Sequence, residues 1–269
     1  MRFVVSAIPA FFRASLQTMF QYRAEIVLWA IWGVVYPAVA MTMWRVAALD
    51  PRKGGDIHGY GPAEFAAYFL LTMVIGHVTT AWDVYELSWL VRTGRMSAKL
   101  LRPILPIWES ICDNLAYKIL TLTILVPLWA AVAWWARPHF AASALQMTLV
   151  VPAVLLAMAL NYVLGYNMAL LSFWITRMDG VGEFWFGASL FFGGRLAPLT
   201  IMPMPLQWLA AALPFKWVIW FPSAALMGGL PPPQIVAGMA YQAGWLVVMI
   251  VVFRLMWRGG VRRYSAVGA

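Results

Sequence analysis

The sequence predicts an all-α, polytopic membrane protein with six transmembrane helices. Of its 269 residues, 63% are hydrophobic and 11% are charged, whereas about a quarter of the residues in a soluble domain carry a charge. The chain also contains long apolar segments, most of them close to or above the roughly 20 residues that a helix needs to cross a bilayer. They lie at residues 26–49, 63–90, 115–136, 144–175, 183–200 and 235–257. We expect residues 1–269 to form a single transmembrane domain, because six spans and short loops leave no room for a soluble one.

The segment before the first span, about residues 3–22, has the pattern of an amphipathic helix. Its polar side chains are Arg2, Ser6, Arg13, Gln17 and Gln21, and its apolar ones are Val4, Ile8, Phe11 and Met19. Such a helix is expected to lie along the membrane surface. Pro9 marks either its start or a kink, and an unstructured basic tail is the alternative.

The distribution of Lys and Arg predicts that both termini are cytoplasmic. With the N-terminus inside, 13 of the 19 cations fall on the cytoplasmic side, where membrane proteins collect Lys and Arg. These are Arg2, Arg13, Arg23, Arg92, Arg95, Lys99, Arg102, Lys118, Arg177, Arg254, Arg258, Arg262 and Arg263. The others are Arg45, Arg52, Lys53, Arg137, Arg195 and Lys216. The net charge of +9 therefore needs no nucleic-acid partner to explain it.

A basic bridge, about residues 91–106, connects the second and third spans. Thr93-Gly94 ends the long helix, Met96 to Leu101 is a short helix-forming run, and Pro103 and Pro106 stop it. A short helix held at both ends could transmit a push from a cytoplasmic partner. The alternative is that the cations of the bridge only orient the loop and bind lipid phosphates.

Motifs for chemistry within this chain are absent from the sequence. No GxxxxGK[ST] stretch occurs, so any ATP hydrolysis must come from a partner. The single cysteine, Cys112, and the scattered His58, His77 and His139 have no metal-ligand spacing, so we predict no metal site. The acidic residues fall near predicted span ends, which disfavours a catalytic or proton-carrying carboxylate in the membrane. Eight of the ten are Glu25, Asp50, Glu64, Asp83, Glu86, Asp113, Asp179 and Glu183.

Small and polar residues share one face in two of the predicted spans. In the second span these are Thr72, Gly76, Thr79, Thr80 and Asp83, and in the fourth they are Asn161, Gly165, Met168 and Ser172. Helix packing is the more frequent reason for such a face in a membrane, and contact with a transported ligand is the alternative. Phe191 and Phe192 either line an apolar path or face lipid.

Three stretches resemble the ABC-2 type transporter permeases, in particular the six-span subfamily called ABC-2 family transporter protein. They are QYRAEIVLW at residues 21–29, VRTGRMSAKLLRPILP at 91–106 and SLFFGGRLAPLTIMPMPLQWLAAALPFKWVIWFPSAALMGG at 189–229. They occur in matching order over nearly the whole chain. The sequence departs from the pattern at Ser97, where many relatives are expected to carry an acidic residue.

The resemblance implies that the bridge is a coupling helix that docks into a separate ABC ATPase subunit. Its docking residues would be Arg92, Gly94, Arg95, Met96, Lys99, Leu100, Leu101, Arg102 and Pro103. The assembly would contain two ATPase subunits, which bind ATP and Mg, and two permease chains, identical or related. The resemblance further implies a re-entrant hairpin at about residues 195–222 that acts as a gate. Its chain-breaking residues are Gly193, Gly194, Pro198, Pro203, Pro205 and Pro214, and an aromatic interfacial loop without a gating role is the alternative.

These implications lead to the expectation of a permease subunit in the bacterial cytoplasmic (inner) membrane, exporting a hydrophobic or amphipathic substrate. The chain itself is expected not to be an enzyme. A non-transporting scaffold that anchors an ATPase for signalling or envelope assembly is the alternative function. A membrane-embedded enzyme ranks third.

Overall fold

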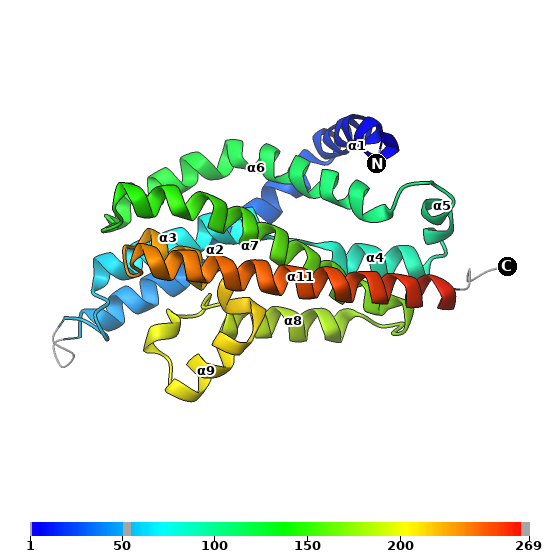
Figure 1. The fold of residues 1–269 in the computed structure, drawn as a ribbon. Helices are drawn as coiled ribbons and strands as arrows, with labels where there is room; N and C mark the ends of the chain where they lie inside the picture. Colours follow the sequence, from blue (N-terminus) through cyan, green and yellow to red (C-terminus); the bar gives the residue numbers. More distant parts are fainter. Residues whose placement is uncertain (1, 51–54, 265–269) are drawn as a thin grey trace.

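The computed structural model describes residues 2–50 and 55–264 of the chain, and there the protein is all-α. Within those ranges the only strand-like pairing is an isolated bridge between Ile57 and Tyr60. Long helices lie side by side along one axis, as Figure 1 shows. The N-terminal helix, the short helix of the bridge and the end of the last helix lie at the same end of this bundle (Figure 1). That arrangement is compatible with the predicted cytoplasmic placement of both termini and the bridge.

Five helices in the described residues are long and apolar enough to cross a membrane. They are α2 (Arg23–Ala48), α3 with α4 (Pro62–Thr79 and Asp83–Arg92), α6 (Pro106–Ala136), α7 (Ala144–Leu170, continued by the turn η2, Leu171–Phe173) and α11 (Pro232–Arg263). A bent pair, Met204–Ala212 and Pro214–Leu226, passes the same test together and makes up to six spans if it is counted as one. The prediction of a polytopic all-α membrane protein is confirmed.

Helix α3 forms the interior of the bundle. It contacts α2, α6, α7 and α10 (Trp220–Leu226), and its aromatic residues Phe65, Tyr68 and Phe69 are fully buried. Of the apolar window in α3 and α4, 67% is buried inside the protein, against 17% in α11. Helix α3 is therefore the span that is most enclosed by its neighbours.

The second span is broken between α3 and α4, where the sequence predicted a continuous helix over residues 63–90. Thr80 has a non-helical conformation, with ψ 139°. The hydroxyls of Thr79 and Thr80 donate to the carbonyls of Ile75 (2.8 Å) and Gly76 (2.6 Å), a kind of bond that bends helices. The break leaves carbonyl groups that cannot stay unpaired in a membrane interior. The structure supplies their partners from α6 and α7, as described below.

The third span begins earlier than predicted, at Pro106 instead of residue 115. Lys118, counted among the cytoplasmic cations, therefore lies well inside α6, and its residue is only 6% exposed. Asp113 likewise lies within the helix and not at a span end. The sequence placed the start of the span at residue 115 because it does not show the partners that the polar residues before it find in other helices. The burial of Lys118 was therefore not predicted, and its placement toward the cytoplasmic side stays a prediction.

The fifth span predicted at residues 183–200 is not one continuous helix. Helix α8 (Asp179–Phe192) has 14 residues and ends before Gly193, fewer than the roughly 20 that a single straight helix needs to cross a bilayer. Gly194 has φ +76°, a conformation that glycine adopts without steric strain. The chain then continues through η3 (Leu199–Ile201), α9 (Met204–Ala212), η4 (Pro214–Trp217) and α10. The bent pair that contains α9, η4 and α10 turns by 81° at its break.

The N-terminal segment forms α1 (Arg2–Gln21), a helix that runs through Pro9 and packs on α6. Ser15 is buried at this contact, where its hydroxyl donates to the Asp113 carboxylate. The Cys112 thiol is also buried there, 3.8 Å from the Ile8 carbonyl oxygen. The predicted helix is therefore present in place of an unstructured tail, and its position along the membrane surface stays a prediction.

The close packing of α11 against α10 gives a test of the fold. A Cβ atom added at Gly238 would lie 2.1 Å from Cε2 of Phe221, whereas one added at Gly244 would meet nothing within 4 Å. Gly238→Ala should therefore lower the free energy of unfolding by about 1–3 kcal/mol through overpacking. Gly244→Ala, the matched control, should leave it unchanged or slightly higher because Ala favours the helix. Thermal unfolding midpoints of the two purified variants in detergent measure this, and equal midpoints would contradict the packing of α10 on α11.

Candidate functional site

The bridge folds into a short helix at one end of the bundle. Helix α5 (Met96–Leu100) agrees with the predicted helical run, and Figure 1 shows it beside the ends of α4, α6 and α11. Gly94, with φ +73°, makes the turn that ends α4 and starts α5. Its carbonyl accepts a bond from the backbone N–H of Ser97 at 3.1 Å. Pro106 then opens α6, as the sequence predicted for a proline that stops the bridge.

The apolar side of α5 is inserted into the protein. Met96 is fully buried, and Leu100 is partly buried. Both pack with Leu87 and Leu90 of α4 and with aromatic residues at the end of α7 in one hydrophobic cluster. The resemblance implies that these two residues contact the ATPase. In the structure they instead hold the bridge on the spans.

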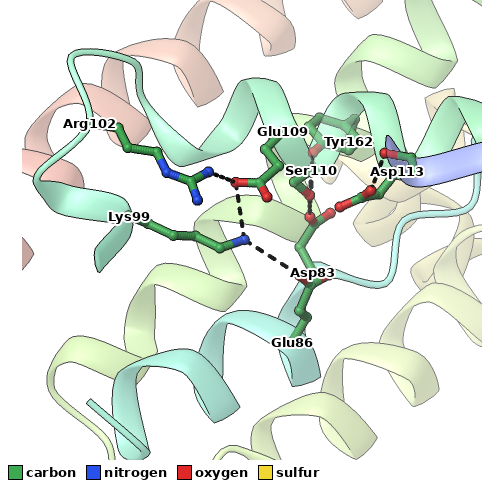
Figure 2. A network of polar contacts seen from close by, with 9 residues as sticks. Asp83, Glu86, Lys99, Arg102, Glu109, Ser110, Asp113 and Tyr162 are labelled. Atoms are coloured by element: carbon green, nitrogen blue, oxygen red, sulfur yellow. Dashed lines mark hydrogen bonds and ion pairs between the residues drawn. The ribbon is translucent and has the colours of Figure 1, made fainter. Parts of the chain in front are cut away.

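Arg95, Lys99 and Arg102 of the bridge have partners within the chain, as Figure 2 shows for Lys99 and Arg102. The Lys99 ammonium lies 3.3 Å from Oε2 of Glu109 and 4.0 Å from Oε1 of Glu86. The Arg102 guanidinium lies 3.2 Å from the same Glu109 oxygen. Arg95 stacks over the ring of Trp89, with 4.5 Å to the ring centroid. Their charges hold the bridge on α4 and α6, although exposed pairs of this kind contribute little to stability each.

One large apolar side chain of the bridge, that of Leu101, does not help to hold the bridge on the spans. Leu101 is 88% exposed, and its neighbours Arg102 and Pro103 are also exposed, with Leu105 41% exposed. We call Leu101, Arg102, Pro103 and Leu105 the docking surface. It lies at the tip of a short, braced loop at an end of the bundle (Figure 1).

Behind the bridge lies a buried polar network that joins α4, α6 and α7 (Figure 2). The Tyr162 hydroxyl donates to Oγ of Ser110 at 2.8 Å. The Ser110 hydroxyl donates to the carboxylate of Asp83, a residue only 6% exposed. Hydrogen bonds to a buried carboxylate are needed to offset its loss of water. Asp83 is therefore inside the bundle and not at a solvated span end, which corrects the sequence-based position.

Deeper in the membrane part, α6 supplies the partners for the broken second span. The Asn114 side-chain amide donates to the carbonyl of Thr80 at 3.0 Å, while its oxygen accepts a bond from the Lys118 ammonium. Thr121 Oγ1 lies 3.0 Å from Nε2 of His77, so His77 connects α3 with α6. These residues of α6 share one helical face with Ser110. Sequence reasoning missed Ser110, Asn114 and Lys118, although their spacing of four was a readable signal.

The predicted faces of the second and fourth spans meet each other. The Asn161 side-chain amide donates to the carbonyl of Thr79 at 2.8 Å, and a Cβ at Gly165 would lie 3.5 Å from Cβ of Ala81. Thr72 is buried and bonds its own helix, Gly76 is buried near Ile219, and Met168 is partly buried. These contacts are helix packing, the interpretation favoured above, and none of them leaves a side chain directed at an open cavity.

The residues predicted for the gate lie around α9 and its flanking turns. The hydroxyl of Tyr68 donates to the carbonyl of Gly194 at 2.5 Å, and the indole of Trp44 donates to the carbonyl of Leu196 at 2.9 Å. Gly193 is buried next to this turn, Phe192 is partly buried and Phe191 is 50% exposed. The prolines mark element starts: Pro198 precedes η3, Pro203 and Pro205 flank the start of α9, and Pro214 opens η4. The segment is thus pinned to α2 and α3 at its beginning.

A shallow apolar depression of about 510 Å³ lies on α11, lined by Ala240, Tyr241, Gly244, Trp245 and Val248. Lipid tails are as apolar as such a lining, so the depression does not by itself mark a ligand site. Within residues 2–50 and 55–264, no group of three or more His, Cys, Asp or Glu side chains is arranged to hold a metal ion.

The comparison with protein families agrees with this architecture. A family model described as ABC-2 family transporter protein matches residues 48–268, a region that contains α3 to α11, the bridge and the segment around α9. No curated protein and no solved structure matches the chain significantly. Proteins of this family are membrane subunits that work with an ATPase in ABC transporters. Because the match covers most of the chain and the fold is a multi-pass helical bundle, the protein belongs to the ABC-2 family of transporter proteins.

Proposed function

We propose that this chain is the permease subunit of an ATP-driven exporter that moves a hydrophobic or amphipathic substrate out of the cytoplasm. Two copies of a separate ABC ATPase subunit bind ATP and Mg and dock on the bridges of two permease chains. The single observation that carries the proposal is Leu101, an exposed leucine at the tip of the braced bridge.

The construction of the bridge supports its role as a transmitter of force. Met96 is buried, Leu100 is partly buried, and Lys99 and Arg102 are paired with Glu109, so these contacts link movement of the loop to the ends of α4 and α6. A push on Leu101 therefore displaces these spans instead of bending the loop. This is the property that a coupling helix requires, and a loop that only binds lipid phosphates does not need it.

The docking surface has the composition of an interface anchor. Burying a leucine completely in a partner stabilises the complex by roughly 1.5–3 kcal/mol, and anchors of this kind dominate protein interfaces. The paired cations contribute less, since their charges are already engaged within the chain. We therefore propose that the leucine supplies affinity and that Arg95, Lys99 and Arg102, which the resemblance counts among the docking residues, maintain the shape of the bridge.

The segment around α9 supports the export part of the proposal. Under the predicted topology it lies at the outer side, and a bend of 81° within it is compatible with a helix pair that enters and leaves the same face. Its attachment through Gly194 and Leu196 to Tyr68 and Trp44 leaves α9 itself exposed. We propose that this segment is the re-entrant hairpin of residues 195–222 and that it closes the path from outside.

The experiment is purification of the chain from its native cells with its neighbours, followed by reconstitution in lipid vesicles. We expect an ABC ATPase to co-purify and the complex to transport a fluorescent amphipathic dye in an ATP-dependent manner. A complex whose ATPase carries a substitution that blocks hydrolysis is the control for passive leakage. Binding of an ATPase without any change in efflux when the chain is deleted from cells would identify the scaffold function instead, and absence of an ATPase would overturn the proposal.

A further inference from the structure

The end of the last span closes onto the bridge through Tyr264. Its hydroxyl donates to the carbonyl of Gly94 at 3.0 Å and lies 3.0 Å from Oγ of Ser97. A tyrosine hydroxyl has one proton, and the Gly94 carbonyl takes it, so the Ser97 hydroxyl donates to Tyr264. The three groups thus form one chain of hydrogen bonds that joins residues separated by 167 positions in sequence.

The ring of Tyr264 is held from the other side. It meets Phe173 of η2 edge to face, at 6.1 Å between ring centroids, and Phe173 also contacts Trp257 of α11 at 6.2 Å. A Cβ at Gly260 would lie 2.4 Å from Cδ2 of Phe173, so the end of α11 is pressed against η2. The hydroxyl of Tyr264 is therefore held in place by ring packing and does not depend on the bridge for its position.

This contact adds a third attachment to the bridge. Covalently, α5 is joined only to α4 and α6, and Met96 packs on α4 and α7. Tyr264 connects the turn at Gly94 and the first turn of α5 to α11, a span that is otherwise remote in sequence. The Tyr264 hydroxyl bonds the backbone of the turn at Gly94. Any movement of α5 relative to α4 must change the conformation of this turn.

At its other end, α11 holds the segment proposed as the re-entrant hairpin. The side-chain amide of Gln242 donates to the carbonyl of Trp217 at 2.8 Å and to that of Ala153 at 3.0 Å. Gly238 packs directly against Phe221. Gln242 lies roughly 33 Å from Tyr264, because both are joined by the continuous helix α11 of 32 residues with a rise of about 1.5 Å per residue. Figure 1 shows α11 extending from the region of α9 to the end where α5 lies.

We propose that Tyr264 is a positioning residue that fastens the bridge to α11, so that α11 carries movement of the bridge directly to the hairpin. The transmission part rests on the proposed function, since it needs an ATPase that moves the bridge. The fastening part does not, because it concerns the chain alone. Continuous packed elements with defined contacts at both ends are the physical basis for such coupling.

The fastening is tested on the purified chain without an ATPase. Tyr264→Phe keeps the ring against Phe173 and removes only the hydroxyl. We expect hydrogen–deuterium exchange of the backbone amides of residues 95–100 to become about five-fold faster, the change that corresponds to loss of one ordinary hydrogen bond. Tyr241→Phe removes a hydroxyl elsewhere on α11 and is the matched control, with unchanged exchange in the bridge. Equal exchange in the two variants would overturn the fastening.

A second arm tests the transmission in the complex with its ATPase. In a Cys112→Ser background, a cysteine placed at Leu209 on the exposed side of α9 reports the hairpin, and its labelling rate is compared with and without ATP. We expect Tyr264→Phe to leave ATPase binding unchanged and to reduce the ATP-dependent change in labelling several-fold, while Tyr241→Phe retains it. A parental response in the Tyr264→Phe complex would overturn the transmission. If the parental chain binds no ATPase, the proposed function fails, and the exchange result still decides the fastening.

Discussion

Leu101→Asp should separate the chain from its ATPase while leaving it folded in the membrane. The side chain is 88% exposed in the isolated chain, so its replacement removes no internal contact. In the complex it removes an apolar anchor and places a carboxylate in a dry pocket. The loss of binding free energy should reach about 2 kcal/mol or more, a weakening of roughly 30-fold. Co-purification with the ATPase and ATP-dependent export of the amphipathic dye measure the effect.

Two variants make this result specific. Leu49→Asp changes another exposed leucine, 64% exposed and located at the C-terminal end of α2, and should leave binding and export at the parental level. Arg102→Ala removes an exposed cation of the docking surface, and its cost should stay below about 1 kcal/mol. If Leu101→Asp binds its ATPase and exports like the parental chain, the bridge is not the docking site.

Asn114→Leu should be among the most destabilising single changes in the spans. Its side chain satisfies two groups at once, because it donates to the Thr80 carbonyl at the break of the second span and accepts from the Lys118 ammonium. Lys118 is 6% exposed, so no water replaces the lost partner. Leaving a buried charge without its partner costs on the order of 3 kcal/mol or more, and the free carbonyl adds to this. The thermal unfolding midpoint in detergent measures the loss.

The double variant Asn114→Leu with Lys118→Met separates the two contributions. It removes the buried ammonium together with its partner, so it should recover part of the stability lost in the single variant. Asn161→Leu, which frees only the Thr79 carbonyl on the other side of the break, should cost less than Asn114→Leu. A double variant that is no more stable than Asn114→Leu would show that Lys118 does not depend on Asn114.

The bridge shows where sequence reasoning reaches its limit. The sequence predicted a short helix between a glycine turn and prolines, and α5 confirms it. It could not tell which of Met96, Leu100 and Leu101 faces outward, because a helix of five residues is too short for a hydrophobic period to define a face. Packing decided this: Met96 and Leu100 complete a cluster with α4 and α7, and only Leu101 remains outside.

The polar residues of α6 show the same limit within the membrane. Residues from Glu109 to Lys118 suggest a loop when they stand alone, since an unpaired polar group in a span is costly. In the structure Ser110 bonds Asp83 of α4, Asn114 bonds the carbonyl of Thr80 at the break after α3, and Lys118 bonds Asn114. With these partners available, the helix starts at Pro106. The break between α3 and α4 was equally hidden, because the groups that stabilise it come from α6 and α7.

The sequence by itself determined that this is an all-α, multi-pass membrane protein with a helical bridge. The bilayer sets the length and the apolar composition that a spanning segment needs, whichever helices surround it. Its three motif stretches were also sufficient to indicate the ABC-2 family. Only the tertiary structure decided which bridge residue is free to dock, which ionisable groups are buried and how α11 is fastened to the bridge by Tyr264. Each of these depends on partners far away in the chain, since the stability of a polar or apolar side chain inside a membrane protein is set by what it touches.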